Sequence, residues 1–464
     1  MIIRLLAALL LLLPLPALAQ PLTAAETRAI DQLVTKSLAD TGVPSASIAV
    51  VRGGRVVLAK AYGKQSEANR PPDARALYQI ASISKQFTAA ALLLLEDEGR
   101  LSLNDPVGRY VPGITSGDRI TLRQLLDHTS GLQDYWPQDF SFPAMANPVT
   151  PQQILDRWAK KPLDFEPGAQ WQYSNTGYVA AGLVVERVAG MPLLDFLQAR
   201  IFRPLGIRAI DQDLAVGAGF PQGYKRFALG PVRPETPAAH GWLYAAGELA
   251  MSAEDLAKWN IARLDRAILP ADDWAAQETA TRLADGSSTG YGLGVVIGTQ
   301  NGRRFVEHGG EAVGFLSESI VFPDDRASIV VLTNSWSGDA YLRIARGIGT
   351  VILPPPPVSA ADARALARVR TVYNQLRNGR VDPALLTENA RYFFTPVALA
   401  DHRTSLSPLG TPTAIVQTGA TRLRGGFELR AFRVTLPSGA LTISTFADPA
   451  SGRIEQYIVS GAQR

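Results

Sequence analysis

The sequence predicts a mixed α+β fold, in which one antiparallel sheet carries terminal helices and a large helical insertion and is followed by a smaller C-terminal α+β domain. Strand patterns occur at both ends of the first 353 residues, with helical or loop-like patterns between them. Four prolines at 354–357 form a spacer that neither a helix nor a sheet crosses. Strands far apart in sequence must therefore share one sheet, and a ligand cleft is expected where sheet and insertion meet.

The elements follow in order along the chain. A helical stripe at 22–39 precedes a strand hairpin at 45–62 that turns at Arg52-Gly53-Gly54. Helical or loop-like patterns run from Ser82 to about Leu264. Strands are expected at 291–299, 303–308, 317–323 and 327–334, and a last helix at about 339–353. The C-terminal part begins with one or two helices at 361–386 and ends in a strand meander at 428–436, 440–447 and 454–460.

Residues 1–19 have the plan of a cleavable secretory signal, with one positive charge, a short leucine-rich run and Ala-Leu-Ala before Gln20. We therefore expect residues 20–353 to form the main domain, 354–358 a linker and 359–464 an accessory domain. The apolar run is too short and too proline-rich for a membrane span, and no cysteine offers a lipid attachment point. The protein is expected to be periplasmic or secreted, without a membrane span in the mature chain.

Composition excludes several classes of function. The chain contains no cysteine, so disulfides, thiol nucleophiles and cysteine-ligated metals are absent. The net charge is +4, and residues 359–464 carry 13 arginines against seven acidic residues, while the part before them is net negative after loss of the signal. No basic run with interleaved aromatic residues accompanies this asymmetry, so no nucleic-acid partner is expected.

Ser82 and Lys85 stand at the start of the apolar stretch AAALLLL. A lysine three residues after a serine lies on the same helical face, and burial lowers the pKa of its amine toward that of a proton acceptor. The pair therefore predicts an activated serine nucleophile. Taken alone, the pattern more often marks a capping serine and a solvated lysine than a nucleophile, so other motifs must decide.

Two further motifs accompany the pair. Tyr173-Ser174-Asn175 is the only Tyr-x-Asn in the chain, and its phenol and amide suit proton sharing and substrate orientation. His308-Gly309-Gly310 is the only His-x-Gly, and its small residues let a strand edge approach a substrate. Ser102-Leu103-Asn104 is an alternative second motif, although it lies in a predicted turn.

In this order and spacing, the three motifs resemble those of the serine β-lactamase and penicillin-binding-protein-like superfamily, in its class C-like branch, which includes D,D-carboxypeptidases, D-amino-acid peptidases, amidases and esterases. The segments 122–132, 165–178, 204–207, 245–259 and 321–334 add to the resemblance, which covers about residues 25–350. It implies the β-lactamase/transpeptidase-like fold. The C-terminal pattern resembles a nuclear-transport-factor-2-like cone, with a role as lid, binding module or oligomerisation surface.

The resemblance also implies roles for residues. Ser82 is the nucleophile, and Lys85 and Tyr173 share the acid and base steps. Substrate binding and orientation fall to Asn175, His308, Gly309 and Gly310, and the oxyanion is held by the backbone N–H groups of Ser82 and Glu311. No metal or organic cofactor is required.

One departure from the family pattern bears on the substrate. In lactam-recognising enzymes the third motif often begins with lysine followed by threonine or serine. Here the neutral imidazole of His308 and the glycine at 309 stand in these places, and they offer a weaker site for a substrate carboxylate. The sequence thus favours hydrolysis of esters, small amides or peptides through an acyl-serine. The alternatives are a D-Ala-D-Ala carboxypeptidase or β-lactamase, with an arginine supplying the missing charge, and a catalytically idle binding or sensor protein. The sequence defines no oligomeric state.

Secondary candidates receive structural interpretations. His128 is expected to fix a buried turn, and Glu166 to serve the loop before Tyr173. A cluster of aromatic residues either lines an acyl pocket or fills the core of the insertion, and the sequence leaves both possibilities open. Its members are Tyr135, Trp136, Phe140 and Phe142.

Overall fold

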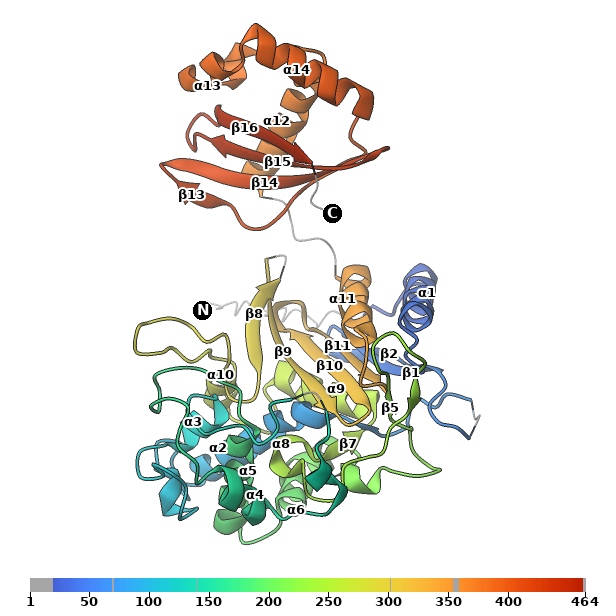
Figure 1. The fold of residues 1–464 in the computed structure, drawn as a ribbon, viewed down its shortest axis with the longest axis vertical. Coiled ribbons are helices and arrows are strands. Elements are labelled where there is room, and N and C mark those ends of the chain that lie inside the picture. Colours follow the sequence, from blue (N-terminus) through green and yellow to red (C-terminus); the bar gives the residue numbers. More distant parts are fainter. Residues whose placement is uncertain (1–19, 69–70, 139, 301, 354–358, 462–464) are drawn as a thin grey trace, which may run out of the picture. The chain divides into compact units, whose positions relative to one another are not determined.

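The computed structural model describes residues 20–68, 71–138, 140–300, 302–353 and 359–461. The predicted signal at 1–19 and the predicted linker at 354–358 lie outside these ranges. The chain divides into two compact units, with the division between Pro354 and Pro355. Figure 1 shows both units, each of which has its own sheet and helices.

A six-stranded antiparallel sheet in the order β2-β1-β11-β10-β9-β8 organises the first unit. Its strands come from both ends of the unit, as the sequence predicted, and the mixed α+β class is confirmed. The strands are β1 (Ser45–Arg52), β2 (Arg55–Gly63), β8 (Val296–Gln300), β9 (Arg303–Ala312), β10 (Phe315–Phe322) and β11 (Ala327–Thr333).

The terminal helices α1 (Ala24–Thr41) and α11 (Ala340–Ile352) pack together on one face of this sheet (Figure 1). Alternation along the central strands explains the two-sided burial. Ile48 and Val50 of β1 face the terminal helices, whereas Ala49 and Val51 join the core of the insertion. The sheet is therefore covered on both faces.

The helical insertion lies between β2 and β8 and forms the larger core. Its helix α2 is buried along its whole apolar length, from Lys85 to Leu95, and packs on α5 and α8. The helices are α2 (Lys85–Asp97), α3 (Leu122–Leu126), α4 (Pro151–Trp158), α5 (Asn175–Ala189), α6 (Leu193–Leu197), α7 (Arg203–Leu205), α8 (Tyr244–Gly247), α9 (Ala253–Asp265) and α10 (Ala271–Gln277). Short strands join them: β3 (Tyr78–Gln79), β4 (Ala209–Asp211), β5 (Tyr224–Lys225), β6 (Arg233–Pro234) and β7 (Leu249–Met251).

Two local predictions were wrong. The strand expected from Tyr291 begins only at Val296, because glycines with positive φ at Gly290 and Gly294 turn the chain, and a Cβ at Gly292 would overlap the carbonyl oxygen of Gln277. The helix expected to carry both Ser82 and Lys85 begins only at Lys85, and Ser82 lies in a 3₁₀ turn, η1 (Ala81–Ser84), directly before α2.

The second unit combines helices with an antiparallel sheet in the order β12-β14-β15-β16, and β13 pairs with β14. Buried Val372, Tyr373 and Leu376 of α12 pack with buried Phe432 and Ile443 of the sheet. Its elements are α12 (Ala360–Leu376), α13 (Glu388–Phe393), α14 (Pro396–Leu406), β12 (Ala414–Gln417), β13 (Arg422–Arg424), β14 (Phe427–Leu436), β15 (Gly439–Ala447) and β16 (Ile454–Gly461). The resemblance of this unit to a nuclear-transport-factor-2-like cone stays a prediction.

None of the helices in the described ranges combines the length and the apolar character of a membrane span.

Because each unit has its own core, residues 20–353 are expected to fold alone. A chain of these residues should be soluble and unfold cooperatively, as followed by circular dichroism during heating. The matched control ends at residue 338 and lacks α11, whose Ile344 and Ile348 are fully buried against the sheet, so it should not fold. An insoluble or molten 20–353 chain would contradict the expectation.

Candidate active site

Ser82 and Lys85 meet at the junction between η1 and α2. Lys85 Nζ lies 3.0 Å from Ser82 Oγ, 2.8 Å from Asn175 Oδ1 and 2.7 Å from the carbonyl oxygen of Ala246. The amide and carbonyl oxygens can only accept, so they engage two N–H bonds of the amine. The third direction of the nitrogen faces the hydroxyl of Ser82, and a neutral amine there would present its lone pair to the serine proton.

The surroundings of Lys85 favour this neutral state. The side chain is fully buried at the start of the apolar helix α2, and this burial lowers its pKa to about 7, partly offset by the Asp134 carboxylate. The rings of Tyr173 and Tyr178 lie with their centroids 4.9 and 5.4 Å from Nζ. A substantial fraction of the amine is therefore unprotonated at neutral pH.

The phenol of Tyr173 also hydrogen-bonds with Ser82. Burial raises its pKa well above the usual phenol range, the Ser82 bond opposes the rise, and the carboxylates of Asp134 and Glu311 add to it. The phenol consequently keeps its proton at neutral pH. Of the two groups assigned to acid and base steps, the lysine fits the base and the tyrosine fits the proton donor.

Asn175 is the first residue of α5, and Asp134 holds it from the opposite side to Lys85. Asp134 Oδ1 accepts from the backbone N–H groups of Asn175 and Trp136, each at 3.1 Å, and Oδ2 accepts from Asn175 Nδ2 at 3.2 Å. This aspartate was not predicted from the sequence. Its position within GLQDYW, in the aromatic loop, was the available signal.

The third motif lies on β9 at the point where one edge of the strand becomes free of β8. The described pairing with β8 covers only Arg303–Glu307, so His308 to Glu311 pair with β10 alone. A Cβ at Gly310 would overlap the carbonyl oxygen of Ile80 and the hydroxyl of Ser317. The missing side chain at Gly310 therefore allows β9 to lie directly against the turn that carries Ser82.

His308 is engaged by its own neighbours. Its Nδ1 lies 2.6 Å from the carbonyl oxygen of Gly309, which requires a proton on Nδ1, and its Nε2 accepts from the hydroxyl of Tyr291 at 2.8 Å. Burial, together with the charge of Lys85, lowers the pKa of His308 to about 4, and the hydrogen bond to Gly309 opposes this shift. The imidazole is neutral near pH 7 and supplies no cation to the site.

These residues line a cleft of about 530 Å³. Ser82, Tyr173, Asn175, His308, Gly309, Gly310 and Glu311 all belong to its lining, as do Trp136, Leu243, Trp336 and Tyr341. Among the described lining residues, Asp134 and Glu311 are the carboxylates, and no arginine or lysine occurs. The indole N–H of Trp336 donates to the carboxylate of Glu311. The oxyanion role of the Ser82 and Glu311 N–H groups stays a prediction.

The members of the aromatic cluster lie in different surroundings. Trp136 lines the cleft, whereas Tyr135 and Phe142 pack against Trp158 and Trp242 in the core and Phe140 is exposed. Core packing is therefore confirmed for Tyr135 and Phe142, and Trp136 is the member of the cluster that lines the cleft; an acyl pocket stays a prediction.

His128 is buried and its Nδ1 accepts from the backbone N–H of Ser174 at 3.1 Å, which fixes a turn as expected. Glu166 forms an exposed ion pair with Arg119.

The alternative second motif, Ser102-Leu103-Asn104, forms a turn in which Ser102 Oγ accepts from the backbone N–H of Asn104. Lys85 instead donates to Asn175 Oδ1. The alternative second motif therefore does not reach the lysine.

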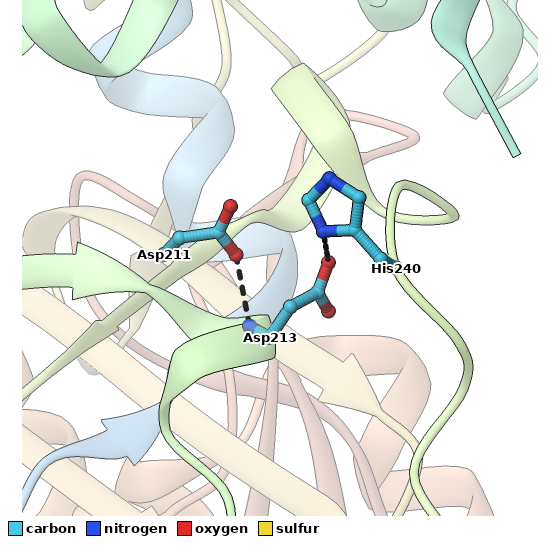
Figure 2. A group of neighbouring side chains, drawn as sticks. All are labelled: Asp211, Asp213 and His240. Carbon is cyan, nitrogen blue, oxygen red and sulfur yellow. Dashed lines mark hydrogen bonds and ion pairs between the residues drawn. The ribbon is translucent and has the colours of Figure 1, made fainter. Parts of the chain in front are cut away.

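Asp211, Asp213 and His240 form a separate group whose potential metal-binding atoms lie within 4.8 Å of one another (Figure 2). Their polar atoms already bond to one another and to neighbouring backbone groups. Asp213 Oδ2 lies 2.7 Å from His240 Nδ1 and accepts from Gly241 N–H at 3.0 Å, and Asp211 Oδ1 accepts from Asp213 N–H at 2.8 Å. We assign no metal to this group.

Comparisons with known proteins identify the family of this chain. The beta-lactamase family profile matches residues 30–348. Penicillin-binding protein 4* of Bacillus subtilis is 28% identical over 395 residues, covering 78% of this chain and 86% of its own length. Protein flp of Staphylococcus aureus is 27% identical over 321 residues, covering 66% of this chain and 62% of its own, so the chain matches less than two thirds of that relative.

Solved structures give the same fold. A D-stereospecific amidohydrolase from Streptomyces sp. is 29% identical with a TM-score of 0.60, over 70% of this chain and 98% of its own. The octameric penicillin-binding protein homologue from Pyrococcus abyssi has a TM-score of 0.61 at 23% identity, over 94% of this chain and 96% of its own, and supports the fold alone. Since the family profile spans more than half of the sequence, the chain belongs to the beta-lactamase family of serine hydrolases.

Proposed function

We propose that this protein is an exported hydrolase that forms an acyl-enzyme on Ser82 and acts on carboxylic esters or small amides and peptides. The observation that carries the proposal is the placement of Lys85 Nζ. Two fixed oxygen acceptors hold it 3.0 Å from Ser82 Oγ, in surroundings that lower its pKa to about 7. Such an amine is a competent general base for a serine.

The proposed reaction has two halves. Ser82 Oγ attacks the acyl carbonyl carbon while its proton passes to Lys85 Nζ. Tyr173 transfers its proton to the leaving alcohol or amine as the bond to carbon breaks, and the proton held by Lys85 then returns to Tyr173, which leaves the amine neutral again. In the second half, Lys85 takes a proton from water as the water oxygen attacks the acyl carbon. Tyr173 then protonates Ser82 Oγ as the acyl–oxygen bond breaks, and the proton on Lys85 again returns to Tyr173. Each step uses groups that bond with Ser82.

The charge of the cleft supports neutral or cationic substrates. Asp134 and Glu311 are its charged lining groups among the described residues, and burial keeps His308 uncharged near pH 7. A carboxylate-bearing substrate would meet repulsion without a matching cation. Penicillin-like acids are accordingly expected to bind poorly.

A second candidate is a cell-wall activity, as a D,D-carboxypeptidase or β-lactamase. The relative named as a penicillin-binding protein favours it, because 86% of that protein's length is matched. The cationic group that this candidate requires is not among the described lining residues.

Intact-mass spectrometry distinguishes these candidates. The mature protein is exposed briefly to p-nitrophenyl acetate, to D-phenylalanine amide and, separately, to benzylpenicillin, and product release is followed in parallel. We expect ester or amide turnover, with an acyl adduct that maps to the peptide containing Ser82 and no lasting penicillin adduct. A stable penicillin adduct on Ser82 would favour the cell-wall candidate. A hydrolytic function would be contradicted if none of the three compounds gave either turnover or an adduct.

A further inference from the structure

We infer that Asp134 is a positioning residue for the nucleophile: it holds the Asn175 amide with its oxygen toward Lys85. This inference rests on the function proposed above. It follows from the continuous chain of hydrogen bonds from Ser82 Oγ through Lys85 Nζ and Asn175 to Asp134.

An amide has one accepting and one donating end, and the two ends are nearly equal in shape. If the Asn175 amide were reversed, its NH₂ group would face Lys85 and would donate to the lone pair that must take the serine proton. Asp134 prevents this reversal, because a carboxylate accepts and cannot donate. Its Oδ2 takes the Nδ2 hydrogen of Asn175 at 3.2 Å, which leaves Oδ1 toward Lys85 at 2.8 Å.

Asp134 is itself held firmly. Its Oδ1 accepts two backbone N–H groups, from Trp136 in its own loop and from Asn175 at the start of α5. These bonds tie the loop to the helix and fix the carboxylate plane. Oδ1 thus serves the backbone and Oδ2 serves the amide, so the two roles can be separated by substitution.

The carboxylate also acts on the charge of Lys85. It stabilises the protonated amine and so opposes the effect of burial on the lysine pKa. Other titratable groups surround the amine: the two phenols whose rings flank it keep their protons, and the two imidazoles that interact with its charge are held neutral by burial. These groups are Tyr173, Tyr178, His128 and His308.

Asp134→Asn tests the inference. The new side chain can still accept both backbone N–H groups through Oδ1, but its NH₂ group now faces the NH₂ of Asn175 and drives the amide to reverse. We expect kcat for p-nitrophenyl acetate to fall about 100-fold. In the wild-type protein kcat/KM should rise with pH through about 7, as Lys85 loses its proton. In the variant this acid limb should move to lower pH, because the charge that favoured protonated Lys85 is gone.

Ser174→Ala is the matched control. Ser174 Oγ accepts from Gly177 N–H at 3.4 Å and caps the same end of α5 without contacting the Asn175 amide. This variant should lower the melting temperature and leave the acid limb where it is. A purely structural Asp134 would behave in the same way as this control.

Asp134→Ser provides a second variant, since a hydroxyl still accepts from backbone N–H groups but carries no charge. An unchanged kcat and acid limb in folded Asp134→Asn would overturn the inference, and so would failure of both variants to fold. Turnover and the Ser82 adduct of the wild-type protein report on the proposed function independently. Their presence together with unaffected variants would reject only the role of Asp134.

Discussion

Ser82→Ala is expected to lose ester hydrolysis by at least about 10⁴-fold while keeping its fold. The hydroxyl supplies the atom that becomes acylated, and Lys85 retains its bonds to Asn175 and Ala246 without it. The side chain lines the cleft, so its removal leaves no void in the core. Initial rates with p-nitrophenyl acetate, intact mass after exposure and a thermal unfolding curve measure the three parts of the expectation.

Ser84→Ala is the control for this variant. Ser84 belongs to the same 3₁₀ turn and is buried, but its Oγ accepts from the backbone N–H of Leu249 at 3.2 Å. Its loss should lower the free energy of unfolding by about 1 kcal/mol and leave turnover within a few-fold of the wild-type value. Retained hydrolysis in Ser82→Ala would refute the acyl-serine mechanism.

Gly310→Ala should have the second largest effect. The added methyl group would overlap the backbone oxygen of Ile80, two residues before the nucleophile, and the hydroxyl of Ser317. β9 must then move away from η1, at a cost of about 1–3 kcal/mol in stability. Since β9 forms one wall of the cleft, we also expect kcat/KM to fall by about 100-fold or more.

Gly309→Ala, one residue earlier, is the control for stability. A Cβ there would lie 3.6 Å from the carbonyl oxygen of Ser317, an ordinary contact, and the φ of Gly309 is outside the left-handed region. Thermal unfolding of the two variants should separate them clearly, with Gly309→Ala close to the wild-type midpoint. Equal midpoints would mean that the close approach of β9 to η1 is not the reason for a glycine at 310.

The parts of the site that the sequence predicted are those with a local or typical pattern. Ser82 and Lys85 are three residues apart, so one turn of chain brings them together whatever surrounds it. The strands of the sheet were predictable, apart from the start of β8, because alternation and β-branched residues mark them. The family profile, which matches residues 30–348, confirms the resemblance on which the remaining assignments depended.

The parts of the site that could not be predicted from the sequence are those that only tertiary contacts bring together. The carbonyl oxygen of Ala246 is a ligand of Lys85, and a backbone acceptor has no side-chain signature. Asp134 is one aspartate among many until the fold places it against Asn175. Likewise, Tyr291 was predicted within a strand, but the glycines around it form a turn that delivers its hydroxyl to His308.

The buried setting of Lys85 couples catalysis to folding. In an unfolded chain the lysine has an ordinary pKa of about 10.4 and is protonated at neutral pH, so Ser82 is an unactivated alcohol. The base forms only when α2 is enclosed by α5 and α8, which supply Asn175 and the carbonyl of Ala246. In a newly made chain Ser82 therefore stays unactivated until these distant segments assemble. The return of the proposed ester hydrolysis during refolding would time the completion of the insertion core.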